Sequence, residues 1–313
     1  MCFKGFVCEL NDNRVSPEAC LACSHERQVT GRNTCHFPPP IIAGIVESNR
    51  PRDLMGYSAT ELIGCHRRVA LKEQVDYWVK PSQAYWAFRG QLGHAIVESH
   101  SGNGHRVIAE ERFYAEVAGM LITGKPDVIY PDDRLLVDYK TTKSVPKDRK
   151  RYACPECGAI LRENQWNARA GTTLTCDCGQ SYRAGTELKP QILPPQPYDT
   201  HVQQLNVYAW LLAENDILVE RAQVVYLDMS EPYPVPVELW PLRRTQTFIE
   251  ERLTALMDRD PQTGLPVGVW DDADANWRCR YCEVLDACER SRAEETLAQG
   301  RRLLRGEEGD GEI

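Results

Sequence analysis

Residues 124–141 have the sequence GKPDVIYPDDRLLVDYKT, in which two short apolar runs flank the turn-forming residues Pro131-Asp132-Asp133. This pattern predicts two antiparallel strands joined by a tight turn. In a strand, residues two apart project from the same face, so Asp138 and Lys140 project together. The hairpin also brings Asp127, which precedes the first strand, to the same edge as Asp138.

These residues can support metal-dependent chemistry on a phosphate group. Two carboxylates and the carbonyl of Tyr139 are oxygen ligands of the kind that Mg²⁺ and Mn²⁺ prefer. The metal would lower the pKa of a bound water, and Lys140 would position that water or stabilise developing negative charge. Because Asp-x-Lys is a very common sequence, the alternative for Asp127, Asp138 and Lys140 alone is an ion pair at a strand end.

Further strands and helices are expected on both sides of this hairpin. Residues 106–116 and 120–124 are expected to form strands that continue into it as one antiparallel meander. Ser58 or Thr60 is expected to cap a helix that contains Cys65. The remaining expectations are a helix over residues 83–99 with a core face of Tyr85, Phe88, Leu92 and Ile96, an amphipathic helix over 200–213, a buried strand over 224–227, and a helix marked by Phe248, Ile249, Leu253 and Leu256.

Three polar residues on the expected helices are candidates for the same site. His94 lies on the helix before the strands and would be a further metal ligand; the alternative is a capped or core histidine. Gln204 and Tyr208 are four residues apart and therefore share one face of the later helix. They would help to place a substrate strand, and the alternative is an ordinary polar face.

The thirteen cysteines fall into three groups, which are more consistent with metal sites than with disulfides in a cytoplasmic protein. In the first forty residues, eleven residues flank the pair Cys20-x-x-Cys23 on either side, up to Cys8 and Cys35. This spacing predicts a four-thiolate zinc site, with Cys2, His25 or His36 as possible substitute ligands, and the alternative is a flexible arm with incidental thiols. A second group has the spacing of a zinc ribbon, followed by a proline-rich linker at residues 190–197. Its members are Cys154, Cys157, Cys176 and Cys178.

Charge and composition narrow the functional classes. The formal net charge is −8, whereas a protein that only coats nucleic acid is usually basic. Residues 140–151 nevertheless contain six basic residues and one acid, which is either a solvated loop or a surface that follows a nucleic-acid backbone. No apolar run approaches the length of a membrane span and no signal pattern begins the chain, so we expect a cytoplasmic protein with no membrane partner.

The succession of motifs resembles the RecB-like branch of the PD-(D/E)XK nuclease superfamily. It comprises a helix from Gly90 to His94, Gly-Lys-Pro-Asp at 124–127, Asp-Tyr-Lys-Thr at 138–141 and Gln-x-x-x-Tyr at 204–208, in the family's order. The resemblance implies a restriction-endonuclease-like α/β (α+β) core with a mixed central sheet flanked by helices. It also implies a metal-dependent DNA nuclease in which His94, Asp127 and Asp138 bind metal.

The third group of cysteines extends this resemblance. One cysteine before the core and three after it is the arrangement found in the Cas-four exonucleases and the AddB-type nucleases. The likeness implies a 4Fe-4S cluster that joins the N- and C-terminal parts, although zinc is the alternative occupant. Its ligands would be Cys65, Cys279, Cys282 and Cys288.

The resulting expectation is a nuclease core at residues 55–150 and 198–290, interrupted by a zinc ribbon at 151–190. It is preceded by a cysteine-rich segment at 1–40 and followed by a helix and disordered acidic tail at 291–313. The expected substrate is single-stranded DNA ends or overhangs, cut 5′ to 3′, with partners from a CRISPR adaptation or recombination complex. The alternatives are a catalytically silent nucleic-acid-binding adaptor and a redox sensor.

Overall fold

The structure, a computed structural model, describes residues 3–30, 35–49, 56–85, 87–90, 106–164, 171–228, 231–260, 263–266 and 278–288. Contacts divide the chain into two compact units. The first unit comprises Met1–Ile96, Phe113–Gly124 and Pro241–Ile313, and the second comprises Val97–Arg112 and Lys125–Trp240. Both units combine helical structure with sheets, so the fold is of the mixed α+β class. Within the described residues, no helix combines the length and the apolar character needed to cross a membrane.

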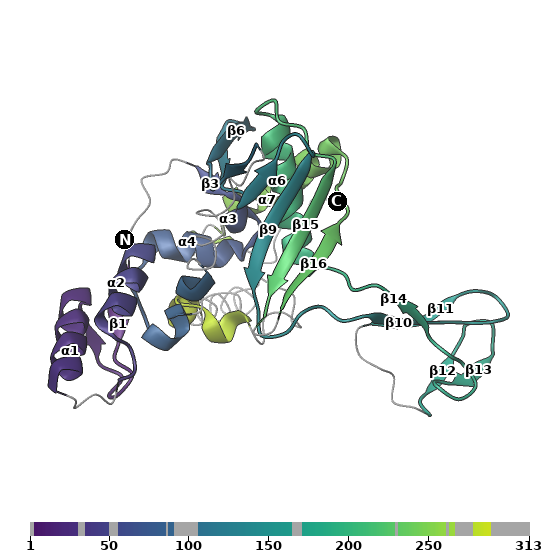
Figure 1. The fold of residues 1–313 in the computed structure, drawn as a ribbon, viewed down its shortest axis with the longest axis horizontal. Helices are drawn as coiled ribbons and strands as arrows, with labels where there is room; N and C mark the ends of the chain where they lie inside the picture. Colours follow the sequence, from purple (N-terminus) through teal and green to yellow (C-terminus); the bar gives the residue numbers. More distant parts are fainter. Residues whose placement is uncertain are drawn as a thin grey trace, which may run out of the picture. The chain divides into compact units, whose positions relative to one another are not determined.

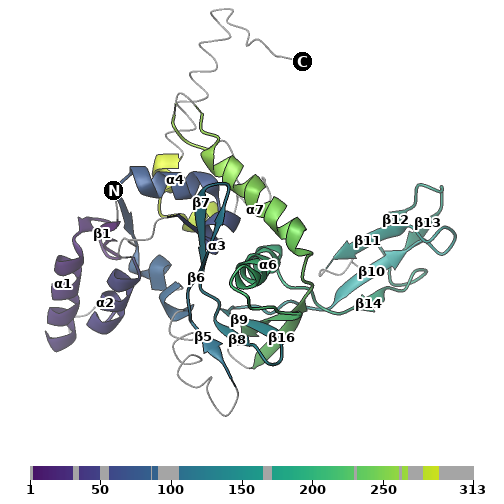
Figure 2. The same ribbon diagram turned by 90° about the horizontal axis from the view of Figure 1, so that it is seen from above.

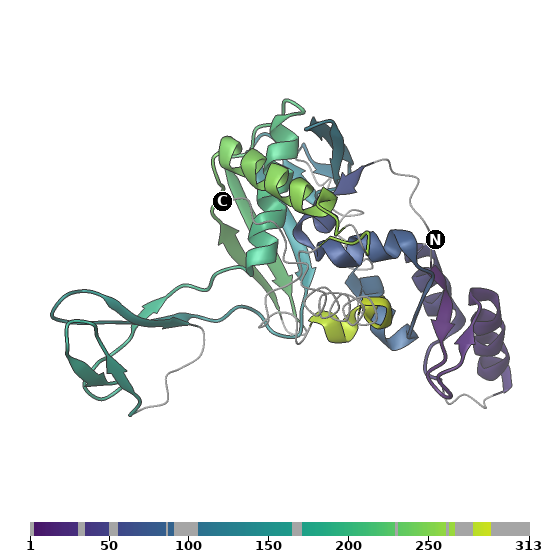
Figure 3. The same ribbon diagram turned by 180° about the vertical axis from the view of Figure 1, so that it is seen from behind.

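A five-stranded mixed sheet of order β16-β15-β9-β8-β5 forms the centre of the second unit (Figure 1). β9 and β15 are parallel, and the other pairs are antiparallel. Parallel neighbours need a crossover connection, and helix α6 (Asp199–Ala213) provides it, packing on both strands (Figures 1 and 3). The strands are β5 (Ile108–Ala109), β8 (Val128–Tyr130), β9 (Leu135–Thr141), β15 (Arg221–Leu227) and β16 (Pro232–Val237).

Helix α6 is a core element rather than an amphipathic one. Every residue from Gln204 to Leu212 is buried, so the expected division into a polar and an apolar face is wrong. The apolar residues of this stretch point in all directions, and a helix of that kind is stable only when it is covered on all sides. The expected buried strand at 224–227 is confirmed as part of β15.

The predicted meander through residues 106–140 is wrong, because its strands belong to two different sheets. β6 (Phe113–Val117) and β7 (Met120–Gly124) form a hairpin in a three-stranded sheet with β3 (Tyr57–Ser58), whereas β8 and β9 belong to the five-stranded sheet. Two residues explain the division. Glu110 has a positive φ of 54°, which interrupts the expected strand over 106–116, and Pro126 has no N–H to extend a ladder.

The sheet β3-β7-β6 of the first unit is accompanied by three helices (Figure 2). These are α3 (Ala59–Ile63), α4 (His66–Gln74) and α7 (Leu242–Met257). Ser58 caps α3 through a capping box with Glu61, as one of the two expected caps. The single helix expected there is two helices, because Gly64 is extended and Cys65 caps α4. Helix α7 confirms the last expected helix and buries Ile249, Leu253 and Leu256.

The N-terminal segment shares a sheet and an apolar cluster with later residues of the first unit. β1 (Phe3–Val7) pairs with β2 (Arg14–Val15) and runs parallel to β4 (Tyr77–Val79), beside helices α1 (Pro17–Thr30) and α2 (Pro39–Ser48). Residues 81–85 and 87–90 are helical, and Phe88 packs against this cluster, as expected. The core position expected for Tyr85 is wrong, because its side chain is exposed. Leu92 and Ile96 lie outside the described residues.

Two small sheets lie between β9 and α6 in the sequence. One has the order β11-β10-β14 and the other is the hairpin β12-β13. The expected linker at 190–197 is only partly a linker, because β14 within it pairs with β10. The strands are β10 (Arg149–Ala153), β11 (Ile160–Asn164), β12 (Thr173–Thr175), β13 (Ser181–Arg183) and β14 (Gln191–Leu193).

Candidate active site and metal centres

Asp127 and Asp138 lie opposite each other on the β8–β9 hairpin. The ladder pairs Val128 with Val137, and Asp127 and Asp138 are one position further on. The Oδ2 atom of Asp127 accepts a hydrogen bond of 2.7 Å from the N–H of Tyr139. Both carboxylates are buried, with exposed fractions of 6% and 0%. The hairpin thus brings the two predicted acids together, as expected from the sequence.

Lys140 lies beside these acids. Its Nζ is 2.6 Å from Oδ2 of Asp138, two residues earlier on the same face of β9. The lysine side chain keeps an exposed fraction of 22%, whereas that of Asp138 is 1%. An ammonium group therefore lies between a buried carboxylate and the solvent, where an approaching anion would meet it.

Helix α6 presents Gln204 and Tyr208 to the same carboxylates. The Nε2 atom of Gln204 donates to Oη of Tyr208 at 2.8 Å, and both side chains are buried. Burial raises the pKa of Tyr208, and the negative charges of Asp138, Asp127 and Glu110 raise it further. Their burial argues against the alternative of an ordinary polar face, and the tyrosine hydroxyl lies within electrostatic reach of three acids.

Glu110 is a site residue that the sequence did not indicate. Its N–H donates to the carbonyl of Asp127 at 3.0 Å, and its carboxylate forms an ion pair with Lys125. Its left-handed backbone turns the chain at this point. One of two adjacent glutamates, Glu110 and Glu111, in a stretch expected to be a strand carries no signal of this role.

His201 and Tyr226 also adjoin the site and were missed. Tyr226 is the in-register neighbour of Lys140 on β15. Its buried hydroxyl accepts from the N–H of Tyr198 at 3.1 Å and lies 2.9 Å from Nδ1 of His201. The ring of His201 contacts the rings of Tyr198 and Tyr226. The signal was present in the sequence, because His201 precedes Gln204 by three residues and so shares its helix face.

The remaining sequence predictions for this site are the metal ligand His94 and the basic run at residues 140–151. His94 lies outside the described residues. In the basic run, Arg149 and Arg151 both pair with Glu163 on the neighbouring strand β11. The run is therefore not a uniform basic loop, although Lys143 and Lys147 are exposed.

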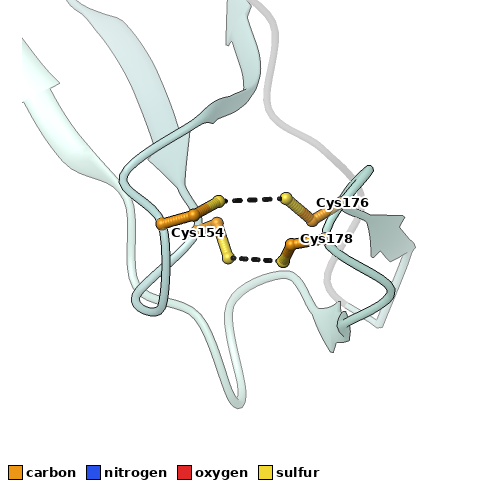
Figure 4. Close-up of side chains that lie close together, drawn as sticks. Cys154, Cys176 and Cys178 are labelled. Carbon is orange, nitrogen blue, oxygen red and sulfur yellow. Dashed lines mark hydrogen bonds between the residues drawn. The ribbon is translucent and has the colours of Figure 1, made fainter.

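The second group of cysteines lies on two similar turns. The N–H of Cys154 donates to the carbonyl of Ala159, and the N–H of Gly158 donates back to Cys154, each at 2.8 Å. On the facing hairpin the N–H of Gly179 donates to the carbonyl of Cys176 at 2.9 Å. Both glycines have a positive φ, which a glycine adopts without steric cost. Figure 4 shows the thiols of the two turns facing each other.

The sulfur atoms of this ribbon are close enough to share a metal. Sγ of Cys154 lies 3.7 Å from that of Cys178, and Sγ of Cys157 lies 3.4 Å from that of Cys176. In the described parts of the chain, this is the only group of three or more His, Cys, Asp or Glu residues whose ligand atoms all lie within 4.8 Å of one another. The ribbon has only a small apolar core, consisting of Tyr152, Leu174, Ala184 and Leu188. A metal would therefore contribute much of its stability.

The third group brings together two segments that are far apart in the sequence. Cys65 precedes α4, and Cys279 begins the short 3₁₀ helix Cys279–Tyr281. Arg68 of α4 makes two hydrogen bonds of 2.9 and 2.7 Å to the carboxylate of Glu283, beside Cys282. Burial raises the pKa of Cys282 to about 11, with a contribution from the charge of Cys65. The fold thus places Cys65 within electrostatic reach of Cys282.

The first group also lies in the first unit. Cys8 follows β1, Cys20 and Cys23 lie on α1, and Cys35 precedes α2. No described cysteine forms a disulfide.

Comparisons with known proteins found a structural likeness and no matching family. No family model and no curated protein matches the chain. Among solved structures, the chain is similar to the protein of "Crystal structure of SSO0001", with 18% sequence identity and a TM-score of 0.45. The match covers 78% of this chain and 91% of that one.

Proposed function

We propose that this chain is a metal-dependent DNA nuclease of the RecB-like PD-(D/E)XK type. The observation that carries the proposal is the meeting of Asp127, Asp138 and Lys140 on one hairpin, with Gln204 and Tyr208 of α6 against the same acids. Two buried carboxylates beside a partly exposed lysine suit the hydrolysis of a phosphodiester. Single-stranded ends or overhangs, trimmed 5′ to 3′, are the substrate that the resemblance favours.

The donor set fits a hard divalent cation. Three carboxylates (Asp127, Asp138 and Glu110) lie near two lysine ammonium groups, so one formal negative charge is left over. Asp127 and Asp138, with His94 and the carbonyl of Tyr139, would hold Mg²⁺ or Mn²⁺. The bound ion would polarise the phosphate and lower the pKa of a water ligand.

The protein residues would orient the substrate and complete the charge balance. Lys140 is held by Asp138 at the solvent side of the acids and would contact the phosphate or the attacking water. Gln204 and Tyr208 would place the strand above the acids. His201 would be a third DNA-contacting residue on α6, beside Gln204 and Tyr208. The hydroxyl of Tyr226 and the rings of Tyr198 and Tyr226 hold its imidazole in one orientation.

The ribbon cysteines fit zinc. In a tetrahedral zinc site with Zn–S bonds of about 2.3 Å, the sulfur atoms lie about 3.8 Å apart. The observed separations of 3.7 and 3.4 Å are close to this value, whereas a four-iron cluster places a larger body between its ligands. We assign the 4Fe-4S cluster to Cys65, Cys279, Cys282 and Cys288 instead, because the Arg68–Glu283 pair joins their two segments.

A nuclease assay tests the proposal directly. The purified chain is incubated with single-stranded DNA labelled at either end, in the presence of Mn²⁺ or Mg²⁺. We expect loss of the label from the 5′ end, abolished by Lys140→Ala and unaffected by Lys189→Ala, a matched change at an exposed lysine of the ribbon. Equal cleavage by wild-type protein and Lys140→Ala would refute the proposal. DNA that is bound but never cut would favour the silent adaptor.

A further inference from the structure

The turn after β1 has the hydrogen-bond pattern of a metal-binding knuckle. The N–H of Cys8 donates to the carbonyl of Asn13 at 2.8 Å, and the N–H of Asp12 donates back to Cys8 at 3.0 Å. In the ribbon, the same two bonds join Cys154 to the residues five and four positions later. The fourth residue is left-handed in both turns, with φ of 56° at Asp12 and 74° at Gly158. Cys8 thus occupies the position of the first ligand in a knuckle.

Helix α1 places two more thiols close to this turn. β2 returns the chain antiparallel to β1, and Ser16 follows it and caps the helix by accepting from the N–H of Ala19 at 3.2 Å. Cys20 and Cys23 are three residues apart and therefore lie on one side of the first turns. The positive end of the helix dipole at this terminus stabilises thiolates.

The fourth thiol is fixed to the same helix through the chain that follows it. Ser24 is buried, and its hydroxyl donates to the carbonyl of Phe37 at 2.6 Å. Cys35 is two residues before Phe37, and Ser24 directly follows Cys23. This bond therefore keeps Cys35 beside the pair on α1.

The segments that carry the four cysteines pack together, because α1 contacts both β1 and α2. Zinc binds cysteines as thiolates, so binding to this group would couple the metal to the packing of these segments. Because the sulfurs are less tightly gathered than those of the ribbon, binding would draw the hairpin, α1 and the segment before α2 together.

We propose that Cys8, Cys20, Cys23 and Cys35 bind one Zn²⁺ ion in a second structural site, separate from the ribbon and from the nuclease site. Four thiolates satisfy the tetrahedral preference of zinc and leave no open position. The site would fasten the β1–β2 hairpin to α1, and so hold β1 in its sheet with β4. It depends on no nuclease activity.

Metal analysis of the full chain tests this inference. Zinc and iron are measured per chain after anaerobic purification of wild-type protein, Cys23→Ser, Cys157→Ser and the double variant. We expect each single variant to lose about one zinc ion, the double variant to lose both, and iron to stay unchanged. Cys2→Ser, a change at the thiol outside the proposed set, should lose none. Full zinc in Cys23→Ser, loss of iron instead of zinc, or equal loss in Cys2→Ser would overturn the site.

Two further measurements apply if Cys23→Ser does not fold. Cys23→His keeps a zinc ligand at the same position and should retain the ion. Wild-type protein loaded with Co²⁺ should show thiolate-to-cobalt absorption that saturates at two equivalents. Saturation at one equivalent would contradict the second site.

Discussion

Asp127 accepts a hydrogen bond within the hairpin and is also a proposed metal ligand. Two substitutions of this residue separate the two roles. Its Oδ2 accepts from the N–H of Tyr139 at 2.7 Å, and its side chain is 6% exposed. A hydrogen bond to a charged group contributes roughly 1.5–3 kcal/mol and a neutral one about 1 kcal/mol. Asp127→Asn keeps an acceptor oxygen, so it should lower the free energy of unfolding by roughly 1 kcal/mol. Asp127→Ala leaves the N–H without its acceptor, and the loss should be roughly 2–3 kcal/mol.

The effect on cleavage should not follow the effect on stability. Both substitutions remove the negative charge that would bind Mg²⁺ or Mn²⁺, so both should lower kcat/KM by about a thousandfold or more, equivalent to about 4 kcal/mol in the barrier. Asp132→Asn makes the same chemical change at an exposed residue of the β8–β9 turn and serves as the control.

The assay pairs denaturant unfolding with cleavage of labelled single-stranded DNA over a series of Mn²⁺ concentrations. If Asp127→Asn folds normally and cleaves at the wild-type rate, Asp127 is a structural residue only and the proposed metal site is wrong.

Three further predictions concern the surroundings of these sites. Ser58→Ala removes the capping box of α3 and should lower the free energy of unfolding by about 1 kcal/mol in urea. Arg252 donates at 2.7 and 2.6 Å to two main-chain carbonyls at the end of α3; Arg252→Met should cost roughly 2–4 kcal/mol, whereas Arg243→Met, at an exposed position of α7, should cost under about 0.5 kcal/mol. Equal unfolding midpoints for these two variants would contradict the role of Arg252. His201→Asn keeps an acceptor for the hydroxyl of Tyr226 but lacks the second ring nitrogen as a donor, so the KM for DNA should rise about tenfold. His201→Gln should bring the KM part of the way back. An unchanged KM in both variants would show that His201 does not contact the DNA.

The local parts of the site could be predicted from the sequence because short-range rules decide them. The turn at residues 131–133 and the two-residue period of β9 were sufficient to bring Asp127 and Asp138 together and to put Lys140 on the same face. The four-residue spacing of Gln204 and Tyr208 was likewise sufficient for their shared face. In the ribbon, the close spacing of the cysteines within each turn predicted that the four thiols would come together, as they do.

The remaining features depend on contacts between distant segments or on single backbone angles. Nothing in the sequence of residues 106–124 shows that Glu110 adopts a positive φ and directs β6 and β7 to another sheet. The contact of His201 with Tyr226 requires β15 to be paired with β9, which is a long-range choice. The burial of α6 on all sides was hidden for the same reason, because it depends on what covers the helix and not on its own pattern.

The two ends of the insertion between β9 and α6 lie side by side in space. Arg149, where its first strand starts, is paired with Leu193 at its last strand, and Oη of Tyr198 donates to the carbonyl of Ser144 at 3.3 Å. A short turn between these ends would therefore replace the whole ribbon without changing the route from β9 to α6. The ribbon therefore has the geometry of a replaceable insertion, and its two paired ends offer a point at which another domain could be grafted.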